Sequence, residues 1–310
     1  MRDLAGRVLA GDIRAAARAI SLIERRENNV APLLSDLYPS TGGAIRIGIT
    51  GPPGAGKSTL AGCLAQRFVA AGRAVGILAV DIASPFSGGA LLGDRIRMQG
   101  LANDPGVFIR SMGNEGLPGG LCRAARDAIR VLEATGKDVV LVETAGVGQT
   151  DVDVAHCVDA VVLTLVPESG DEIQLLKAGV MEIADVIALN KSERPGANGL
   201  AGALRETLHA RGEVDGWETP LVCTVGTQGE GLAELYEALE AYSRHLGTGD
   251  RLAVLRNQQL RRELRERVEA RLAFSLSAAP ARECLDRAVA RVRAGKDDPY
   301  NAAERLSGEM

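Results

Sequence analysis

The sequence predicts an α/β fold with a mostly parallel sheet, flanked by helical segments at both ends of the chain. Through the middle of the chain, short apolar runs alternate with helical patterns, and this alternation is typical of βαβ units. Hydrophobic residues make up 46% of the 310 residues and aromatic residues only 3%, so the core must be aliphatic, as in sheets buried on both faces. A glycine-rich loop between the first apolar run and the helical pattern after it is the third observation.

The elements divide the chain into an N-terminal helical extension at 1–43, an α/β domain at 44–248 and a C-terminal helical arm at 249–310. We expect two helical segments in the extension, before its Pro- and Gly-rich end. The expected strands cover 44–50, 74–80, 107–109, 139–142, 160–166, 186–189 and 221–223. The helical patterns between them cover 57–71, 94–102, 120–135, 172–184, 198–211 and 231–246. In the arm, apolar residues at helical spacing predict one long helix at 251–274 and a second that begins at Pro280.

Composition and charge exclude several classes of function. The net charge is −4, which argues against a nucleic-acid binder, because such proteins depend on a basic surface. No apolar stretch approaches the ~18 residues that span a bilayer, and the N-terminus lacks the apolar core of a secretion signal. The five cysteines form no Cys-x-x-Cys pair that would indicate zinc or redox chemistry. We therefore expect a cytoplasmic protein that binds neither membrane nor nucleic acid.

A phosphate-binding loop follows the first expected strand. Residues 51–58 fit the pattern G-x-x-x-x-G-K-[ST] and open an expected helix, which is the context that the motif requires. The glycines let backbone N–H groups surround an anion, and the helix N-terminus adds partial positive charge. Lys57 would reach the outer phosphates and Ser58 would bind magnesium, so the fold class becomes that of a P-loop NTPase. The predicted nucleotide contacts here are Gly51, Pro52, Pro53, Gly54, Ala55, Gly56, Lys57, Ser58 and Thr59.

Two later loops favour guanine as the base. The expected strand 186–189 leads into Asn190-Lys191-Ser192-Glu193, which resembles the Asn-Lys-x-Asp pattern of guanine recognition. A carboxylate at Glu193 would accept hydrogen bonds from the guanine ring N–H and amine, which adenine does not offer. The loop after the next strand contains Val225 and Gly226, whose N–H groups would meet the guanine oxygen. GTP and GDP are therefore the expected nucleotides.

Carboxylates at strand ends predict the magnesium site. Asp81 and Glu143 each end an expected strand, and ligands of parallel sheets gather at the carboxyl ends of the strands. Asp94 lies in a Gly-rich segment between them. Because Mg²⁺ favours a few carboxylates together with phosphate oxygens, we expect Ser58, Asp81, Asp94 and Glu143 to contact it directly or through water.

Residues 143–149 have the form of a switch loop. The N–H of Gly146 would bind the γ-phosphate and move when that phosphate leaves. Val147 is apolar and cannot orient water, so Gln149 is the nearest candidate for that role. The expected catalytic residues are Lys57, Glu143 and Gln149, with hydrolysis that is slow until a partner stimulates it. A further loop at 167–174 is expected to move as well.

With these motifs in order, the chain resembles the MeaB/ArgK GTPases, the bacterial relatives of the methylmalonic aciduria type A protein. The resemblance covers most of residues 44–231. It is carried by the stretches GITGPPGAGKSTL, LAVDIASPFSGGALLGDRIRM, DVVLVETAGVGQTDVDV, VPESGDEIQLLKAGVMEIADVIALNKSE and VGTQGEG. Glu193 departs from the family pattern, which has Asp at this position.

The resemblance implies a homodimeric GTPase that uses GTP and Mg²⁺ and binds a cobalamin-dependent acyl-CoA mutase, typically methylmalonyl-CoA mutase. Such a protein gates adenosylcobalamin loading and protects or reactivates the mutase. In the family pattern, Lys57, Asp81, Asp94 and Glu143 fall on residues tied to nucleotide, magnesium and switching. The loop after Pro167 falls on the segment that relays the nucleotide state, and the C-terminal helices fall on the dimerisation arm.

Three other classes share parts of this pattern. A nickel or cobalt metallochaperone GTPase would need a Cys or His cluster on the switch side, which the sequence lacks. A P-loop kinase would need a lid with several arginines, and Arg95, Arg97 and Arg110 keep that alternative open. A module that binds nucleotide without hydrolysing it would agree with the apolar Val147. Phosphate release measured with GTP and ATP, with and without a mutase, separates these classes.

Overall fold

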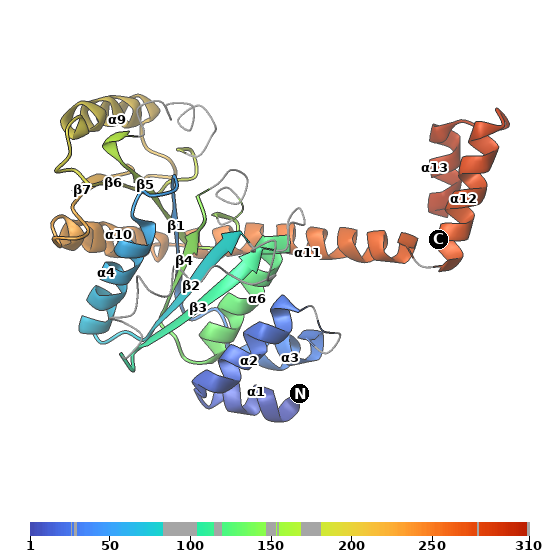
Figure 1. Cartoon of the computed structure of the whole chain (residues 1–310), viewed down its shortest axis with the longest axis horizontal. Coiled ribbons are helices and arrows are strands. Elements are labelled where there is room, and N and C mark those ends of the chain that lie inside the picture. The colour runs from blue at the N-terminus through green and yellow to red at the C-terminus, as the bar shows by residue number, and fades with distance from the viewer. Residues whose placement is uncertain are drawn as a thin grey trace. The chain divides into compact units, whose positions relative to one another are not determined.

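The computed structural model (Figure 1) forms two compact units, Met1–Arg256 and Asn257–Met310. The structure describes residues 1–25, 27, 30–82, 104–114, 120–146, 153, 155–168, 181–277 and 279–308.

The first unit contains one parallel sheet whose described strands run in the order β3-β2-β4-β1-β5-β6-β7. The strands are β1 (Ile45–Thr50), β2 (Val75–Ile82), β3 (Val107–Asn114), β4 (Val139–Thr144), β5 (Ala160–Leu165), β6 (Val186–Asn190) and β7 (Leu221–Thr224). Strands β4, β5 and β6 are buried along their whole length, because helices cover both faces. The predicted α/β fold with a parallel sheet is confirmed.

Helices form a layer on each face of this sheet. On one face α4 (Lys57–Ala70) and α10 (Leu232–Leu246) pack against apolar residues of β1, β4 and β5. On the other face α6 (Gly120–Ala134) packs together with α1 (Arg2–Leu9), α2 (Ile13–Glu24) and α3 (Val30–Leu37). Helix α9 (Ala197–Arg211) covers β5 and β6 with a smaller cluster. These clusters are mostly aliphatic, as the composition indicates.

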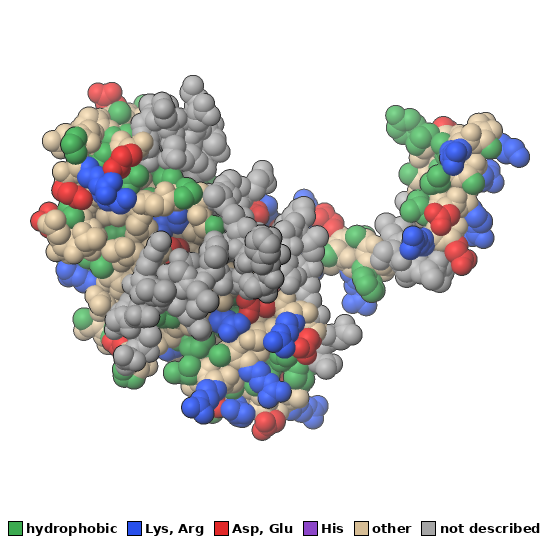
Figure 2. Space-filling view, viewed as in Figure 1, with side chains coloured by type: hydrophobic (Ala, Val, Ile, Leu, Met, Phe, Trp, Pro, Cys, Tyr) green, Lys and Arg blue, Asp and Glu red, His purple; other side chains and the backbone are tan. Residues whose placement is uncertain are grey.

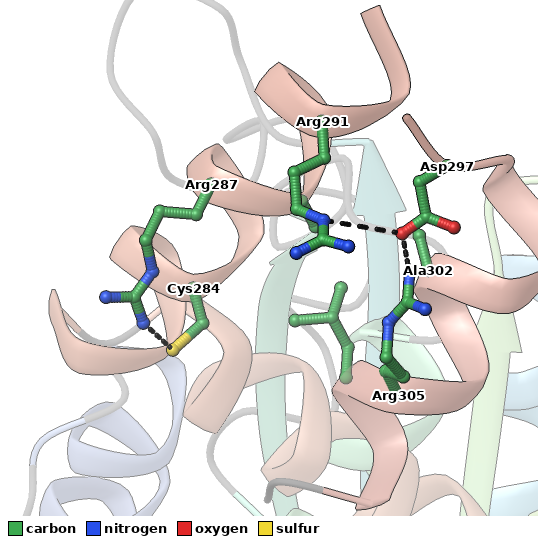
Figure 3. A pocket seen from close by; sticks show the side chains of 8 residues that line it. Cys284, Arg287, Arg291, Asp297, Ala302 and Arg305 are labelled. Atoms are coloured by element: carbon green, nitrogen blue, oxygen red, sulfur yellow. Dashed lines mark hydrogen bonds and ion pairs between the residues drawn. The ribbon is translucent and has the colours of Figure 1, made fainter. Parts of the chain in front are cut away.

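The second unit contains most of α11 (Arg251–Ser277), whose first six residues belong to the first unit, together with α12 (Ala279–Arg293) and α13 (Pro299–Gly308). The loop between α12 and α13 supplies Asp297, whose nearly buried carboxylate forms ion pairs with Arg291 and Arg305 (Figure 3). Arg287 donates to the Cys284 thiol over 3.0 Å beside a cavity of about 340 Å³. The two ion pairs of Asp297 hold α12 and α13 together as a hairpin.

The structure differs from the predicted elements at four places. The N-terminal extension contains three helices and not two, and α13 is an additional helix. Strand β3 continues five residues beyond the predicted end, to Asn114. The helix predicted at 94–102 lies outside the described residues, as does most of the one at 172–184, whose last part, 181–183, is a turn.

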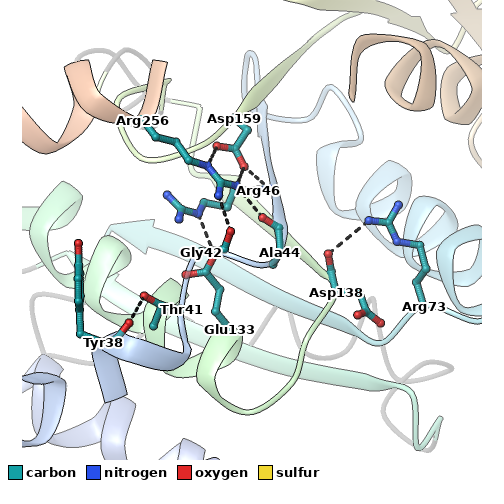
Figure 4. A network of polar contacts seen from close by, with 10 residues as sticks. All are labelled: Tyr38, Thr41, Gly42, Ala44, Arg46, Arg73, Glu133, Asp138, Asp159 and Arg256. Atoms are coloured by element: carbon teal, nitrogen blue, oxygen red, sulfur yellow. Dashed lines mark hydrogen bonds and ion pairs between the residues drawn. The ribbon is translucent and has the colours of Figure 1, made fainter. Parts of the chain in front are cut away.

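Arg256, near the start of the long helix α11, is bound at the amino ends of strands β1 and β5 (Figure 4). Arg256 forms a bidentate ion pair with Asp159, with nitrogen–oxygen distances of 2.9 and 2.7 Å. The same guanidinium donates to the carbonyls of Gly42 and Ala44 at 2.5 and 2.8 Å. Asp159 also accepts the backbone N–H of Arg46 in β1 over 3.0 Å. The start of α11 is therefore part of the body that contains β1.

A second, largely buried carboxylate, that of Asp185, lies just before β6. Its Oδ2 accepts the N–H of Val161 over 2.8 Å, and its carbonyl accepts the indole N–H of Trp217 over 2.8 Å. Burial raises the pKa of Asp185 from 3.8 to about 6, against the lowering effect of a hydrogen bond with Tyr242. The same burial and the Asp185 charge raise the pKa of Tyr242.

This carboxylate predicts a pH dependence of stability. Because the folded state binds the Asp185 proton more tightly than the unfolded state, its contribution is fully present below pH 3.8 and is lost as the pH rises through about 6. We expect Asp185→Asn to remove up to about 3 kcal/mol of the pH-dependent change in unfolding free energy across this window. Urea unfolding followed by circular dichroism at several pH values measures it, and a variant that keeps the wild-type slope would contradict the assignment.

The surface on the side seen in Figure 2 mixes acidic and basic side chains over the N-terminal helices and around α9. Among the described helices, none combines the length and the apolar character needed to cross a bilayer. The described residues also contain no group of three or more His, Cys, Asp and Glu side chains placed to hold a metal.

Candidate nucleotide-binding site

The phosphate loop connects β1 to α4 at the carboxyl edge of the sheet. A cavity of about 530 Å³ opens there, between this loop and the ends of β2 and β4. Its lining residues are Pro53, Gly54, Gly56, Lys57, Ser58, Thr59, Ala79, Val80, Glu143, Thr144, Ala145 and Lys191. Residues predicted from three separate stretches of sequence, the phosphate loop, Glu143 and Lys191, thus surround one cavity.

Lys57, the first residue of α4, is buried within the loop that it terminates. Its side chain is folded back, so that Nζ donates to the carbonyls of Gly51 and Pro52 over 2.8 and 3.0 Å. Only 6% of the residue is exposed. The backbone of the loop therefore positions the ammonium group beside the cavity, where it can meet a phosphate as a point charge.

Ser58 and Glu143 join the phosphate loop to the end of β4. Ser58 Oγ donates to Glu143 Oε1 over 2.5 Å, and both side chains are buried. A hydroxyl and a carboxylate oxygen that meet at the rim of a phosphate cavity are the donor set that Mg²⁺ takes in nucleotide sites. The residues present fit the ion: Ser58 and Glu143 would hold it, and it would offset the negative charge of the phosphates.

The side chains of the other two predicted magnesium ligands, Asp81 and Asp94, lie outside the described part of the structure. Asp81 is the seventh residue of the eight in β2, so its backbone lies at the same edge of the sheet as Glu143. Asp94 lies outside the described residues, and so does Gln149, the predicted water-orienting residue. Their roles stay predictions.

Gly146 packs directly against the phosphate loop. Its φ is +81°, and a Cβ built there would lie 2.1 Å from the carbonyl oxygen of Gly51 and 2.5 Å from Nζ of Lys57. Only glycine fits this backbone conformation and this space. The switch loop predicted from the sequence therefore begins in contact with the groups that would hold the phosphates.

Asn190 and Lys191 tie the base-recognition loop to the phosphate loop. Asn190 Nδ2 donates to the Ala55 carbonyl over 2.7 Å, and a Cβ on Gly56 would come within 2.3 Å of the same nitrogen. Lys191, with φ +56°, donates from Nζ to the Gly54 carbonyl over 2.7 Å. The residues predicted to recognise the base thus also fix the shape of the phosphate loop.

Three further base contacts were predicted in this region. The N–H of Gly226 donates to Asn190 Oδ1 over 3.1 Å, and the N–H of Val225 donates to the carbonyl of Glu230 over 3.1 Å. Both N–H groups are thus used within the chain. Glu193 is exposed, and its carboxylate lies 4.0 Å from Nε of Arg194. The predicted contacts of these three residues with guanine stay predictions.

Arg194 connects the base-recognition loop to the segment after β5. Its guanidinium forms an ion pair with Glu168, and this hydrogen bond lowers the pKa of the Glu168 carboxyl. Both side chains are about half exposed, so the pair contributes little to stability. The remainder of the predicted loop at 167–174 lies outside the described residues beyond Glu168.

The departure at Glu193 gives a testable prediction. We expect Glu193→Asp to tighten GTP relative to ATP, because the shorter side chain matches the bidentate geometry of guanine recognition better than Glu does. Competition titration of a fluorescent GTP analogue with GTP and ATP measures the ratio. An unchanged or smaller ratio would mean that the longer side chain is already well accommodated.

Two residues near the cavity were not predicted as site residues. Thr224 donates its hydroxyl to Asn190 Oδ1 over 3.2 Å, and Thr144 lines the cavity beside Glu143. A signal for both exists in the sequence, since each is a polar residue at the last position of an apolar strand. The carboxyl ends of parallel strands are where ligands gather.

Comparison with known proteins agrees with this geometry. The family model described as "Methylmalonyl Co-A mutase-associated GTPase MeaB" matches residues 16–281. A Pyrococcus abyssi protein named as a GTPase is 43% identical over 311 residues, which cover 99% of this chain and 96% of that protein. GTPase ArgK of Escherichia coli is 35% identical over 271 residues, which cover 85% of this chain and 82% of ArgK.

Among solved structures, one described as "LAO/AO transport system kinase" superposes with a TM-score of 0.73 and 27% sequence identity. The match covers 99% of this chain and 96% of that one. The phosphate loop, the Ser58–Glu143 contact and the matched family model agree with one another. The chain is a P-loop GTPase that belongs to the MeaB family, the methylmalonyl-CoA mutase-associated GTPases.

Proposed function

We propose that this protein is the GTP-hydrolysing chaperone of a cobalamin-dependent acyl-CoA mutase, with methylmalonyl-CoA mutase as the first candidate. In this proposal it acts in the cytoplasm, gates the loading of adenosylcobalamin and protects or reactivates the mutase. The family description, which names the mutase, supports the choice of partner. The absence of a Cys or His cluster from the sequence favours this function over a metallochaperone.

The observation that carries the proposal is the packing of Gly146 against Gly51 and Lys57. A loop that begins in contact with the phosphate-holding groups must rearrange when the terminal phosphate is bound or lost. Ser58 and Glu143 add a second connection between the same two segments. A nucleotide-dependent change would therefore start at residue 143 and pass to the segment after residue 146, where a partner can sense it.

Hydrolysis by the protein alone is proposed to be slow. Val147, the residue after Gly146, is apolar and cannot orient an attacking water. Gln149 is the proposed orienting residue, and the bound mutase would place it. Lys57 would neutralise charge on the phosphates while Glu143 and Ser58 hold the magnesium ion.

The C-terminal arm is proposed to form a homodimer. Within α11 and the unit that follows it, Leu264, Val268 and Leu272 are each more than half exposed, at 55%, 56% and 56%. They recur at helical spacing and so form an exposed apolar stripe. A second copy of the same helix would cover such a stripe.

The test compares nucleotide states. We expect methylmalonyl-CoA mutase to raise kcat for GTP hydrolysis. The affinity for the mutase, measured by calorimetry, should differ between GDP and a non-hydrolysable GTP analogue by about fivefold to 150-fold, the range that a coupling free energy of 1–3 kcal/mol gives. ATP and its analogue serve as controls. A mutase that changes neither the rate nor its own affinity with nucleotide state would refute the proposal.

A further inference from the structure

Two buried threonine hydroxyls join the ends of strands β1 and β4. Thr50 is the last residue of β1 and Thr144 is the last residue of β4. Thr144 Oγ1 donates to Thr50 Oγ1 over 3.1 Å, and neither residue is more than 3% exposed. Because Ile49 pairs with Glu143 in the strand register, the two threonines are the next residues along each strand. The hydroxyl bridge therefore joins the last residues of these two strands, where their loops begin.

Each threonine is adjacent in sequence to a residue of the nucleotide site. Gly51 begins the phosphate loop immediately after Thr50, and Glu143 immediately precedes Thr144. Gly146, two residues after Thr144, packs so closely on Gly51 that a Cβ would lie 2.1 Å from its carbonyl oxygen. A change in the separation of the ends of β1 and β4 would therefore alter the contact between Gly146 and Gly51.

The hydroxyl bridge lies on the opposite face of the sheet from the Ser58–Glu143 contact. Side chains alternate between the faces of a strand. Val142 packs in the cluster with α6, whereas Leu141 packs in the cluster with α4. Thr144 therefore projects to the α6 face and Glu143 to the α4 face. The bridge acts on the site through the backbone that it holds.

We infer that Thr144 is a positioning residue for GTP hydrolysis. Its hydrogen bond to Thr50 sets the separation of β1 and β4 at the edge of the sheet, and so aligns Glu143 and Gly146 with the phosphate loop. The inference rests on the hydrolytic activity and not on the proposed mutase partner. Positioning of this kind has large kinetic effects, because a displacement of about 1 Å can lower a rate by about 10²-fold.

The test removes the hydroxyl and keeps the shape of the side chain. We expect Thr144→Val to lower kcat for GTP hydrolysis by about tenfold to hundredfold, while KM for GTP changes little. The thermal midpoint should fall modestly, because the buried Thr50 hydroxyl loses this donor. Thr144→Ser, which restores the hydroxyl, should recover most of the lost kcat. A role in stability alone would lower the thermal midpoint and leave kcat of the folded protein unchanged.

Thr164 offers a matched control on the neighbouring strand β5. It is fully buried, and its hydroxyl has no hydrogen-bond partner among the described residues. Thr164→Val makes the same chemical change in the same sheet without removing the bridge. We expect it to keep the wild-type kcat, with equal or higher stability, because a buried hydroxyl without a partner costs free energy.

Substitution of Thr50, the acceptor of the hydrogen bond, gives an independent measurement. Thr50→Val should lower kcat as Thr144→Val does, and the double variant should be no slower than the slower single variant, since both remove the same hydrogen bond. Thr50→Val also decides the matter if Thr144→Val does not fold. The inference is overturned if the valine variants keep the wild-type kcat, if their effects on kcat multiply, or if Thr164→Val is equally slow.

Discussion

We expect Lys57→Ala to lower kcat for GTP hydrolysis by about 10³-fold or more. This is the upper end of the effect measured when one preorganised charge-stabilising group is removed from an active site. The ammonium group is held at the cavity by the carbonyls of Gly51 and Pro52 at 2.8 and 3.0 Å. No other residue of the loop at 51–58 carries a positive charge. Alanine removes that charge and leaves the two carbonyls without this donor. Single-turnover phosphate release with saturating enzyme measures the effect.

Lys137 is the control for this change. It too is buried, at 8% exposed, and donates to the Gly106 carbonyl over 3.3 Å, and its burial lowers its pKa. It precedes β4 and so lies at the other end of the sheet from the cavity. Lys137→Ala should affect stability and keep the wild-type kcat. Wild-type turnover in a folded Lys57→Ala protein would end the assignment of the site.

Gly146→Ala is expected to have the next largest effect. The added Cβ would lie 2.1 Å from the Gly51 carbonyl oxygen and 2.5 Å from Lys57 Nζ. Both neighbours belong to the phosphate loop, so the backbone of one loop has to move. We expect kcat to fall by about 10²-fold, the size of effect that a displacement of about 1 Å produces, together with a lower thermal midpoint.

Gly136→Ala separates the clash from the backbone strain. Gly136 has φ +84°, close to the +81° of Gly146, but a Cβ there would meet no atom within 4 Å. It therefore pays only the left-handed conformational penalty, about 1–2 kcal/mol, and should keep the wild-type kcat. If the two variants lose stability equally and both hydrolyse GTP at the wild-type rate, the packing of Gly146 has no part in the reaction.

Much of the fold could be predicted because the strands of a sheet covered on both faces are continuous apolar runs. The parallel sheet and the strand–loop–helix context of the phosphate loop followed from this pattern. The N-terminal extension was harder: α3 is short and has Pro32 as its third residue. A proline is tolerated in the first turn of a helix, but in a sequence it indicates a helix end.

Helix α13 was missed although the sequence contains its start signal. Asp298 accepts the N–H groups of Tyr300 and Asn301 over 2.9 and 3.0 Å, and Pro299 is the first helical residue. Asp followed by Pro is a typical N-cap. Strand β3 was predicted too short because Arg110 is charged. In the structure its guanidinium binds Ser21 and Glu24 of α2, a tertiary contact that no local pattern reveals.

The candidate site was predicted in its parts, and the structure adds how the parts meet. Spacing and residue type pointed to Lys57, Ser58, Glu143 and Lys191, which all line one cavity. The Thr50–Thr144 bridge could not be predicted with the same ease. It depends on β1 and β4 being neighbours, and a sequence without the strand order does not say which strand ends lie side by side.

The binding of Arg256 by Gly42, Ala44 and Asp159 gives strand β1 a mechanical role. Its amino end is fastened to the root of α11 through these groups, and its carboxyl end continues into the phosphate loop. A strand of six residues is a stiff strut about 20 Å long. A displacement of the start of α11 would therefore act on β1, and β1 leads directly into the phosphate loop at its carboxyl end.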